Sequence, residues 1–158
     1  MTETTIAVLG LGEAGSAFAS DLAAVGAIVR GYDPVVTAPP GVIDCTDEAD
    51  AVRTAELILS VNSASAAIGA FRAAAEQVAP GAVWADLNTA EPALERTLDA
   101  QAAARGITFA DVSIMAPVPG RGLSTPLLSS GRRPGCREAA RKIRGIGDRA
   151  GRARRRRC

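Results

Sequence analysis

Three glycines, at positions 10, 12 and 15, form the pattern GxGxxG in the segment GLGEAG. The segment follows a short apolar run and opens a stretch whose apolar residues have helical spacing. In that context the first glycine permits a tight turn, the second lets the backbone approach a pyrophosphate, and the third lets the helix pack on the strand. The pattern predicts a dinucleotide site at the helix N-terminus. The residues expected to hold the cofactor here are Gly10, Leu11, Gly12, Glu13, Ala14 and Gly15.

Asp33 ends the second predicted strand, at the position where an acid accepts the ribose hydroxyls of a dinucleotide. A carboxylate repels a 2′-phosphate, and the next three residues, Pro34, Val35 and Val36, supply no arginine to hold one. NAD is therefore favoured over NADP. Three alternatives remain open: Asp33 only caps a turn, the glycines form a structural turn, or the site takes another nucleoside. An adenosylmethionine site is disfavoured by the glycine spacing and by the MAPVPG segment.

Two further loops follow predicted strands and are expected at the same edge of the sheet. Asn62 follows the run at residues 57–61, and Thr89 follows the run at residues 82–87. Both side chains are neutral hydrogen-bonding groups suited to the nicotinamide ribose or amide. The alternative is that Ser63 and Thr89 are ordinary helix N-caps.

The elements that must position these residues alternate between strand and helix. Strands are expected over residues 4–9, 27–32, 57–61, 82–87 and 107–112, and helices over residues 13–25, 47–55, 64–79 and 91–104. Residues 115–126, with three prolines and two glycines, are expected to form a loop before a short strand at 127–130. This alternation predicts an α/β protein: a Rossmann-type, doubly wound parallel sheet in a three-layer αβα arrangement.

Composition excludes several classes. The 158 residues suit one domain, contain no apolar run long enough for a membrane span, and begin without a basic, apolar leader, so a cytoplasmic protein is expected. The three cysteines show no CxxC spacing and there is no histidine, so no metal site is predicted and no imidazole is available as a base.

Four segments together resemble the N-terminal, cofactor-binding domain of the β-hydroxyacid dehydrogenase family, which includes 6-phosphogluconate and 3-hydroxyisobutyrate dehydrogenases. They are GLGEAGSAFASDL, YDP, DLNTAEP and FADVSIMAPVPGRG. The resemblance covers about residues 4–131 and implies NAD(P)-dependent oxidation of a small hydroxy acid, held between this domain and a following helical domain. It also implies a homodimer where such a helical domain is supplied.

The resemblance implies a substrate loop at Pro117, Gly120 and Arg121. Here Pro119 replaces a hydroxyl residue of the family pattern and Arg121 replaces a glycine, so a different substrate is expected. Arg121 is expected either to clamp a carboxylate or phosphate or to lie solvated on the surface.

The family's catalytic lysine has no match in this chain. The only lysine, Lys142, lies in REAARKIRG, without the glycine-rich approach of the family pattern. The helical domain that closes the substrate cleft in the family is also expected to be missing. No catalytic residue is therefore predicted, and the chain is expected to bind a dinucleotide while having little or no dehydrogenase activity alone.

Charge divides the chain into a domain at residues 1–131, with a net charge of −9, and an Arg-rich tail at residues 132–158, with a net charge of +10. Three interpretations of the tail stay open. It is a truncated or frame-shifted end, since 20 of its 27 residues are Arg, Gly, Ala or Pro; or a solvated tail with a short helix at 137–144; or an arm for nucleic acid or another anionic partner. The last gives the alternative function, a dinucleotide-binding module with a basic arm, although the tail has no aromatic residue to stack on bases.

Overall fold

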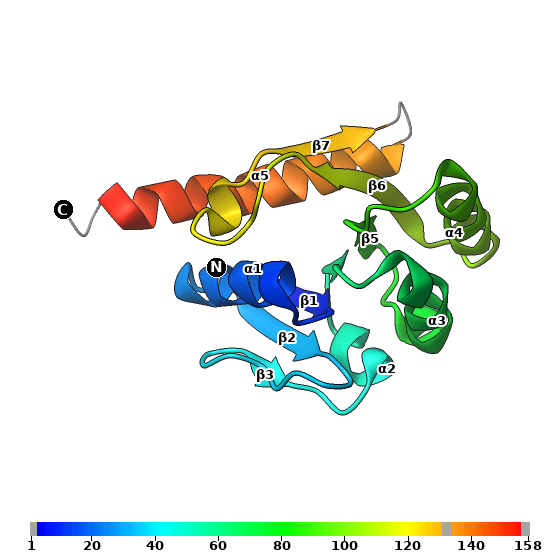
Figure 1. The fold of residues 1–158 in the computed structure, drawn as a ribbon, viewed down its shortest axis with the longest axis horizontal. Helices are drawn as coiled ribbons and strands as arrows, with labels where there is room; N and C mark the ends of the chain where they lie inside the picture. The colour runs from blue at the N-terminus through cyan, green and yellow to red at the C-terminus, as the bar shows by residue number, and fades with distance from the viewer. Residues whose placement is uncertain (1–2, 131–133, 156–158) are drawn as a thin grey trace.

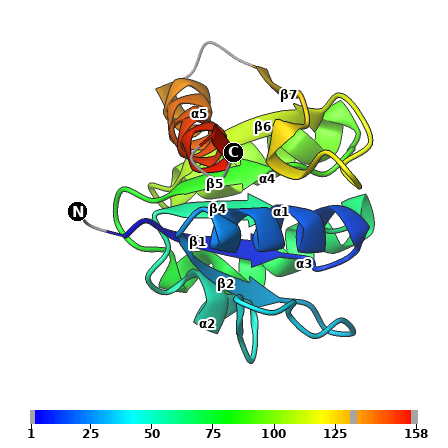
Figure 2. The ribbon, with the colours of Figure 1, turned by 90° about the vertical axis from the view of Figure 1, so that its left-hand side faces the viewer.

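The computed structural model describes residues 3–130 and 134–155. Seven strands form one sheet in the order β3-β2-β1-β4-β5-β6-β7, parallel except for β7, which runs antiparallel to β6 (Figures 1 and 2). The strands are β1 (Thr5–Leu9), β2 (Ile28–Tyr32), β3 (Ile43–Asp44), β4 (Leu57–Ser60), β5 (Val83–Asp86), β6 (Thr108–Ile114) and β7 (Leu127–Ser130). The helices are α1 (Glu13–Ala24), α2 (Glu48–Val52), α3 (Ala64–Ala74), α4 (Pro92–Ala104) and α5 (Pro134–Arg155), with 3-10 turns η1 (Ala75–Gln77) and η2 (Gly122–Ser124).

The central strands are short apolar runs because both faces of the sheet are covered. In β1, Ile6 and Val8 enter one apolar core while Ala7 and Leu9 enter the other, and all four are buried. This alternation follows from the twofold repeat of a strand. The sheet therefore separates two cores.

Each core is closed by its own helices (Figures 1 and 2). Helices α1 and α5 cover one face, and α2, α3 and α4 cover the other. On the second face Phe71 of α3 meets Trp84 of β5 edge to face, with ring centroids 4.9 Å apart. Such aromatic pairs add stability beyond the area that they bury.

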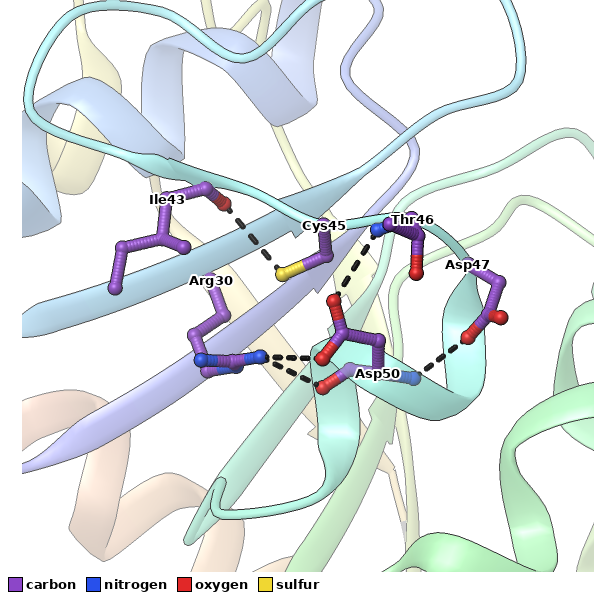
Figure 3. A network of polar contacts seen from close by, with 6 residues as sticks. All are labelled: Arg30, Ile43, Cys45, Thr46, Asp47 and Asp50. Atoms are coloured by element: carbon purple, nitrogen blue, oxygen red, sulfur yellow. Dashed lines mark hydrogen bonds and ion pairs between the residues drawn. The ribbon is translucent and has the colours of Figure 1, made fainter.

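A polar network fixes the edge of the sheet where β3 and α2 lie (Figure 3). The carboxylate of Asp50 accepts a hydrogen bond from Arg30 of β2 at 2.7 Å and one from the Thr46 backbone N–H at 3.2 Å. Asp47 caps α2 by accepting from the Asp50 N–H at 2.7 Å. Helix α2 has only five residues and would be unstable alone, so these side-chain hydrogen bonds help to stabilise it.

The C-terminal segment forms helix α5 and packs against the sheet. Cys136, Ala139 and Ile146 are buried in the same core as β1, β4, β5 and β6. This differs from one of the three interpretations of the tail, a solvated tail with a short helix at 137–144. The small side chains of Cys136 and Ala139 let an otherwise Arg-rich helix approach the sheet closely.

The Rossmann-type fold predicted from the sequence is confirmed, with further local differences. Strand β3, only two residues long, was not predicted, and the helix expected over 64–79 ends at Ala74 and continues as a single 3-10 turn. Within the part of the chain that the structure describes, no helix combines the length and apolar character needed to cross a membrane.

Candidate functional site

The glycine loop joins the end of β1 to the start of α1, and two of its glycines are required by the chain itself. Gly10 has a φ of +95°, and a Cβ there would overlap the carbonyl of Val61. A Cβ on Gly15 would overlap the Gly10 carbonyl oxygen. Side chains at either position would therefore separate α1 from the sheet.

Gly12 differs, because an added Cβ would meet no atom within 4 Å and its backbone angles are ordinary. It is the N-cap of α1 and, as a glycine, supplies no side-chain hydrogen bond, so the N–H groups of the first turn have no capping side chain. The exposed Gly12 thus borders the space in which backbone N–H groups and the helix dipole favour an anion.

Asp33 is tied to the glycine loop by its carboxylate. Oδ2 accepts a hydrogen bond from the Leu11 N–H at 2.9 Å, and Oδ1 accepts from the Val35 and Val36 N–H groups at 2.8 and 2.9 Å. Burial raises the pKa of this carboxyl, but the three backbone hydrogen bonds outweigh it and leave the pKa below its ordinary value. Asp33 is therefore anionic at neutral pH and lies beside the loop, as the sequence predicts for a ribose-binding acid.

Of the two predicted loop residues, Asn62 lies at the glycine loop, whereas Thr89 follows β5. The Asn62 side chain is close enough to Gly10 that a Cβ there would clash with Asn62 Oδ1, and its Nδ2 donates to Ser60 Oγ at 3.1 Å. Thr89 is exposed beyond the end of β5 and lines a separate cavity beside α4.

The predicted substrate loop also begins at this edge, where β6 ends. Pro117, Gly120 and Arg121 are exposed, whereas Val118 between them is buried and its carbonyl accepts from the Arg121 and Gly122 N–H groups at 2.9 and 2.8 Å. The Leu123 N–H donates to Asp21 of α1 at 3.0 Å. The loop is thus folded back onto α1, and Arg121 faces solvent.

Sequence reasoning missed an acid cluster where the carboxyl end of β5 pairs with the middle of β6, consisting of Asp86, Glu95 and Asp111. Asp86 and Asp111 are paired in the sheet register and share the face of Trp84 and Phe109, toward α4, which carries Glu95. Glu95 precedes the buried Leu98 by three residues and Ala102 by seven. An acid on the apolar stripe of a helix was the signal available in the sequence.

Burial perturbs two of these acids strongly. Burial raises the pKa of Asp86 to about 6, although hydrogen bonds from Asn88 oppose the shift. Burial, with the nearby charges of Asp86 and Asp111, raises the pKa of Glu95 to about 8. Both carboxyls therefore titrate near neutral pH.

Lys142 lies at the amino ends of the parallel strands, whereas the glycine loop lies at their carboxyl ends. Its Nζ donates to the Glu56 carbonyl at 2.9 Å, and Glu56 immediately precedes β4. The loop that contacts Gly10 follows the other end of β4, about 15 Å away at roughly 3.3 Å per strand residue. Lys142 therefore does not belong to the site at the carboxyl edge.

The fold and the glycine loop define the class: a Rossmann-type dinucleotide-binding domain. The chain matches the family model of the NAD-binding domain of 6-phosphogluconate dehydrogenase over residues 5–134 and belongs to that family. The family relationship and NAD as the family's cofactor, both inferred from the sequence, are confirmed at this level. A comparison with curated proteins gave no match.

Solved structures share the fold over nearly all of the chain. Mycobacterium tuberculosis 3-hydroxyisobutyrate dehydrogenase with L-serine has a TM-score of 0.81 at 23% identity, covering 94% of this chain and 52% of its own. A conserved hypothetical protein of Sinorhizobium meliloti has a TM-score of 0.81 at 28% identity, with 92% and 52% covered.

An imine reductase variant of Myxococcus stipitatus in complex with NAD+ gives a TM-score of 0.78 at 23% identity, with 92% and 52% covered. A structure of the imine reductase from the same organism contains NADP+. The chain thus spans about half the length of each of these structures.

Proposed function

We propose that this chain binds NAD at the glycine loop and serves as the dinucleotide-binding part of an oxidoreductase that acts on a small hydroxy acid. The observation that carries the proposal is the difference between the glycines. Gly10 and Gly15 are needed for packing, whereas Gly12 borders open space at the N-terminus of α1. A bound pyrophosphate explains why that space is kept clear.

Asp33 and Asn62, which lie beside the glycine loop, would supply further contacts to the cofactor. Asp33 would accept the ribose hydroxyls through lone pairs that its three backbone bonds leave available, and Asn62 would face the nicotinamide half. NAD supplies a hydride acceptor when bound. The anionic Asp33 and the absence of an arginine at residues 34–36 support NAD over NADP. The imine reductase of Myxococcus stipitatus, which has a similar fold, was solved with NADP+.

The substrate loop would add Pro117, Gly120 and Arg121, with the exposed guanidinium of Arg121 available to a carboxylate. The proposal further holds that this chain alone has little or no dehydrogenase activity. Its one lysine lies at the far edge of the sheet and it has no histidine, so neither group can move the hydroxyl proton.

Gly12→Leu tests the proposed binding. We expect the dissociation constant for NADH, followed by NADH fluorescence, to rise at least about 100-fold because the side chain fills the phosphate space. The urea midpoint should stay near that of the wild type, since no atom lies within 4 Å of the new Cβ. Gly69→Leu, on the exposed face of α3 and equally free of neighbours, is the matched control and should bind NADH normally.

Wild-type affinity in a folded Gly12→Leu variant would contradict the proposed site. The same wild-type protein, incubated with NAD and a panel of β-hydroxy acids, should form no NADH above background. Turnover of about 1 s⁻¹ or faster would overturn the proposed inactivity but leave the binding proposal intact.

A further inference from the structure

Ser60 is a polar residue at the carboxyl end of the apolar strand β4, and it is completely buried. The residues before it in the strand, Leu57, Ile58 and Leu59, are apolar and buried as well. A buried hydroxyl costs free energy unless it is hydrogen-bonded. The hydrogen bonds of Ser60 therefore account for a hydroxyl at this position.

The Ser60 hydroxyl accepts hydrogen bonds from two carboxamides. The Nδ2 atoms of Asn62 and Asn88 each donate to Ser60 Oγ at 3.1 Å. Asn62 follows β4 and Asn88 follows β5, so one hydroxyl joins the loops after two neighbouring strands. A serine hydroxyl has two acceptor lone pairs, and both are occupied here.

The proton of the Ser60 hydroxyl decides which atoms of the two amides face it. Ser60 lies opposite Asp86 in the register of β4 and β5, and its hydrogen bond to the Asp86 carboxyl opposes the rise in pKa that burial causes there. Because its one proton is directed to a carboxyl, the hydroxyl offers only lone pairs to the amides. Both carboxamides must therefore turn their nitrogen atoms toward Ser60.

This orientation leaves the amide oxygen of Asn62 facing the glycine loop. Asn62 Oδ1 lies 2.8 Å from the position that a Cβ on Gly10 would take. Asn62 is only partly buried, and among the residues that the structure describes none donates a hydrogen bond to this oxygen. Asn62 thus presents an oriented acceptor beside the loop.

We propose that Ser60 is a positioning residue of the NAD site, which holds the Asn62 carboxamide so that Oδ1 accepts a hydrogen bond from the nicotinamide ribose or the nicotinamide amide. This inference rests on the proposed function, which puts the nicotinamide half of the cofactor beside Asn62. An amide that rotates freely must be ordered when the ligand binds, and this ordering costs affinity. The hydrogen bond to Ser60 removes that cost in advance.

Ser60→Ala tests the positioning role when two ligands are compared by isothermal titration calorimetry. NADH contains the nicotinamide half, whereas ADP contains only the adenosine and the pyrophosphate. We expect the dissociation constant for NADH to rise about tenfold and that for ADP to stay within about twofold of the wild-type value. Ser129→Ala, which removes a hydroxyl bonded to the Cys136 carbonyl, is the control on β7 and should bind both ligands as the wild type does.

A double-mutant cycle separates positioning from a general loosening of the fold. Asn62→Ala should weaken NADH binding about as much as Ser60→Ala does. The double variant should bind NADH no more weakly than Asn62→Ala alone, because Ser60 acts through Asn62. Equal weakening of NADH and ADP by Ser60→Ala, or additive losses in the double variant, overturns the proposal.

The wild type distinguishes a failure of this inference from a failure of the proposed function. If the wild type shows no saturable NADH binding, the proposed function and this inference both fall. If it binds NADH and Ser60→Ala shows no selective loss, only the positioning role is overturned. If Ser60→Ala does not fold, Ser60→Cys, whose sulfur is a weak acceptor, should show the selective loss, and unchanged NADH affinity there contradicts the proposal.

Discussion

Asp33 shows how one carboxylate can serve the chain and a ligand together. Its oxygens already accept three backbone N–H groups, which hold the Leu11 turn and the residues after β2 in place. A carboxylate oxygen accepts more than one hydrogen bond, so ribose hydroxyls can be added to an acceptor that is already oriented. The structural alternative considered for Asp33, a turn cap, is compatible with the ribose role.

Asp33→Asn should reduce NADH affinity about tenfold and lower the ratio of NADH affinity to NADPH affinity. The amide keeps only one acceptor oxygen, so part of the loop loses its partner, and the charge that repels a 2′-phosphate is gone. Fluorescence titrations with both cofactors measure the ratio. Asp47→Asn, the same substitution at the N-cap of α2, is the control and should leave NADH binding unchanged.

An unchanged ratio of NADH to NADPH affinity in a folded Asp33→Asn variant would show that cofactor choice is made elsewhere. Asp47→Asn should cost little stability, because asparagine caps a helix about as well as aspartate does.

Among the elements, α5 departs most from expectation. It is mostly charged and small residues, yet Cys136, Ala139 and Ile146 enter the core over β4, β5 and β6, and the Cys136 carbonyl accepts from Ser129 Oγ of β7 at 3.3 Å. The helix is therefore part of the folded unit over the residues that pack on the sheet.

Ala139→Asp should lower the free energy of unfolding by about 3 kcal/mol or more, because Ala139 is fully buried and the substitution places an unpaired charge against the sheet. Urea denaturation measures it. Ala100→Asp, at an exposed position inside α4, gives the cost of the same substitution in a solvated helix. Equal losses in the two variants would mean that α5 contributes nothing to the stability of the core.

The sequence predicted the elements whose pattern is strong and local. Five parallel strands and the helices between them follow from apolar runs and from glycine and proline stops. Strand β3 lacks such a run: Ile43 and Asp44 are both exposed and are placed by pairing with β2. Helix α5 has too few apolar residues for its packed face to be recognised.

The same division holds at the site. The glycine loop, Asp33 and Asn62 are neighbours as expected because consecutive βα units bring them to one edge. The acid cluster was missed because it depends on the register of β5 and β6 and on the rotation of α4, neither of which is written in a local motif. Whether Thr89 and the exposed Arg121 contact a ligand stays a prediction.

For the molecule as a whole, the buried acids should set how stability depends on pH. Asp86 and Glu95 have folded pKa values of about 6 and 8, above ordinary values of 3.8 and 4.5. When folding raises the pKa of a carboxyl, the free energy of unfolding is highest below the pKa of the unfolded state. It falls as the pH rises through the pKa of the folded state. The free energy of unfolding should therefore fall between about pH 4 and pH 9, with Asp86 contributing about 3 kcal/mol.

Urea midpoints at unit intervals from pH 5 to pH 9 measure this profile. Glu95→Gln should flatten the decline above pH 7, where Asp86 is already ionised, whereas Glu91→Gln should keep it. A wild-type profile that is flat or rising over this range would show that the two acids do not ionise within the folded protein as described.

The three glycines of the loop differ in how much space surrounds them. Gly10 and Gly15 are confined by neighbouring backbone, and Gly12 has open space around its Cα. A randomised library selected only for folded, soluble protein should therefore retain glycine at positions 10 and 15 and accept many residues at position 12. Selection for retention on an immobilised dinucleotide should restore glycine at position 12. Sequencing the two pools then separates the glycines required for folding from the glycine required for ligand binding.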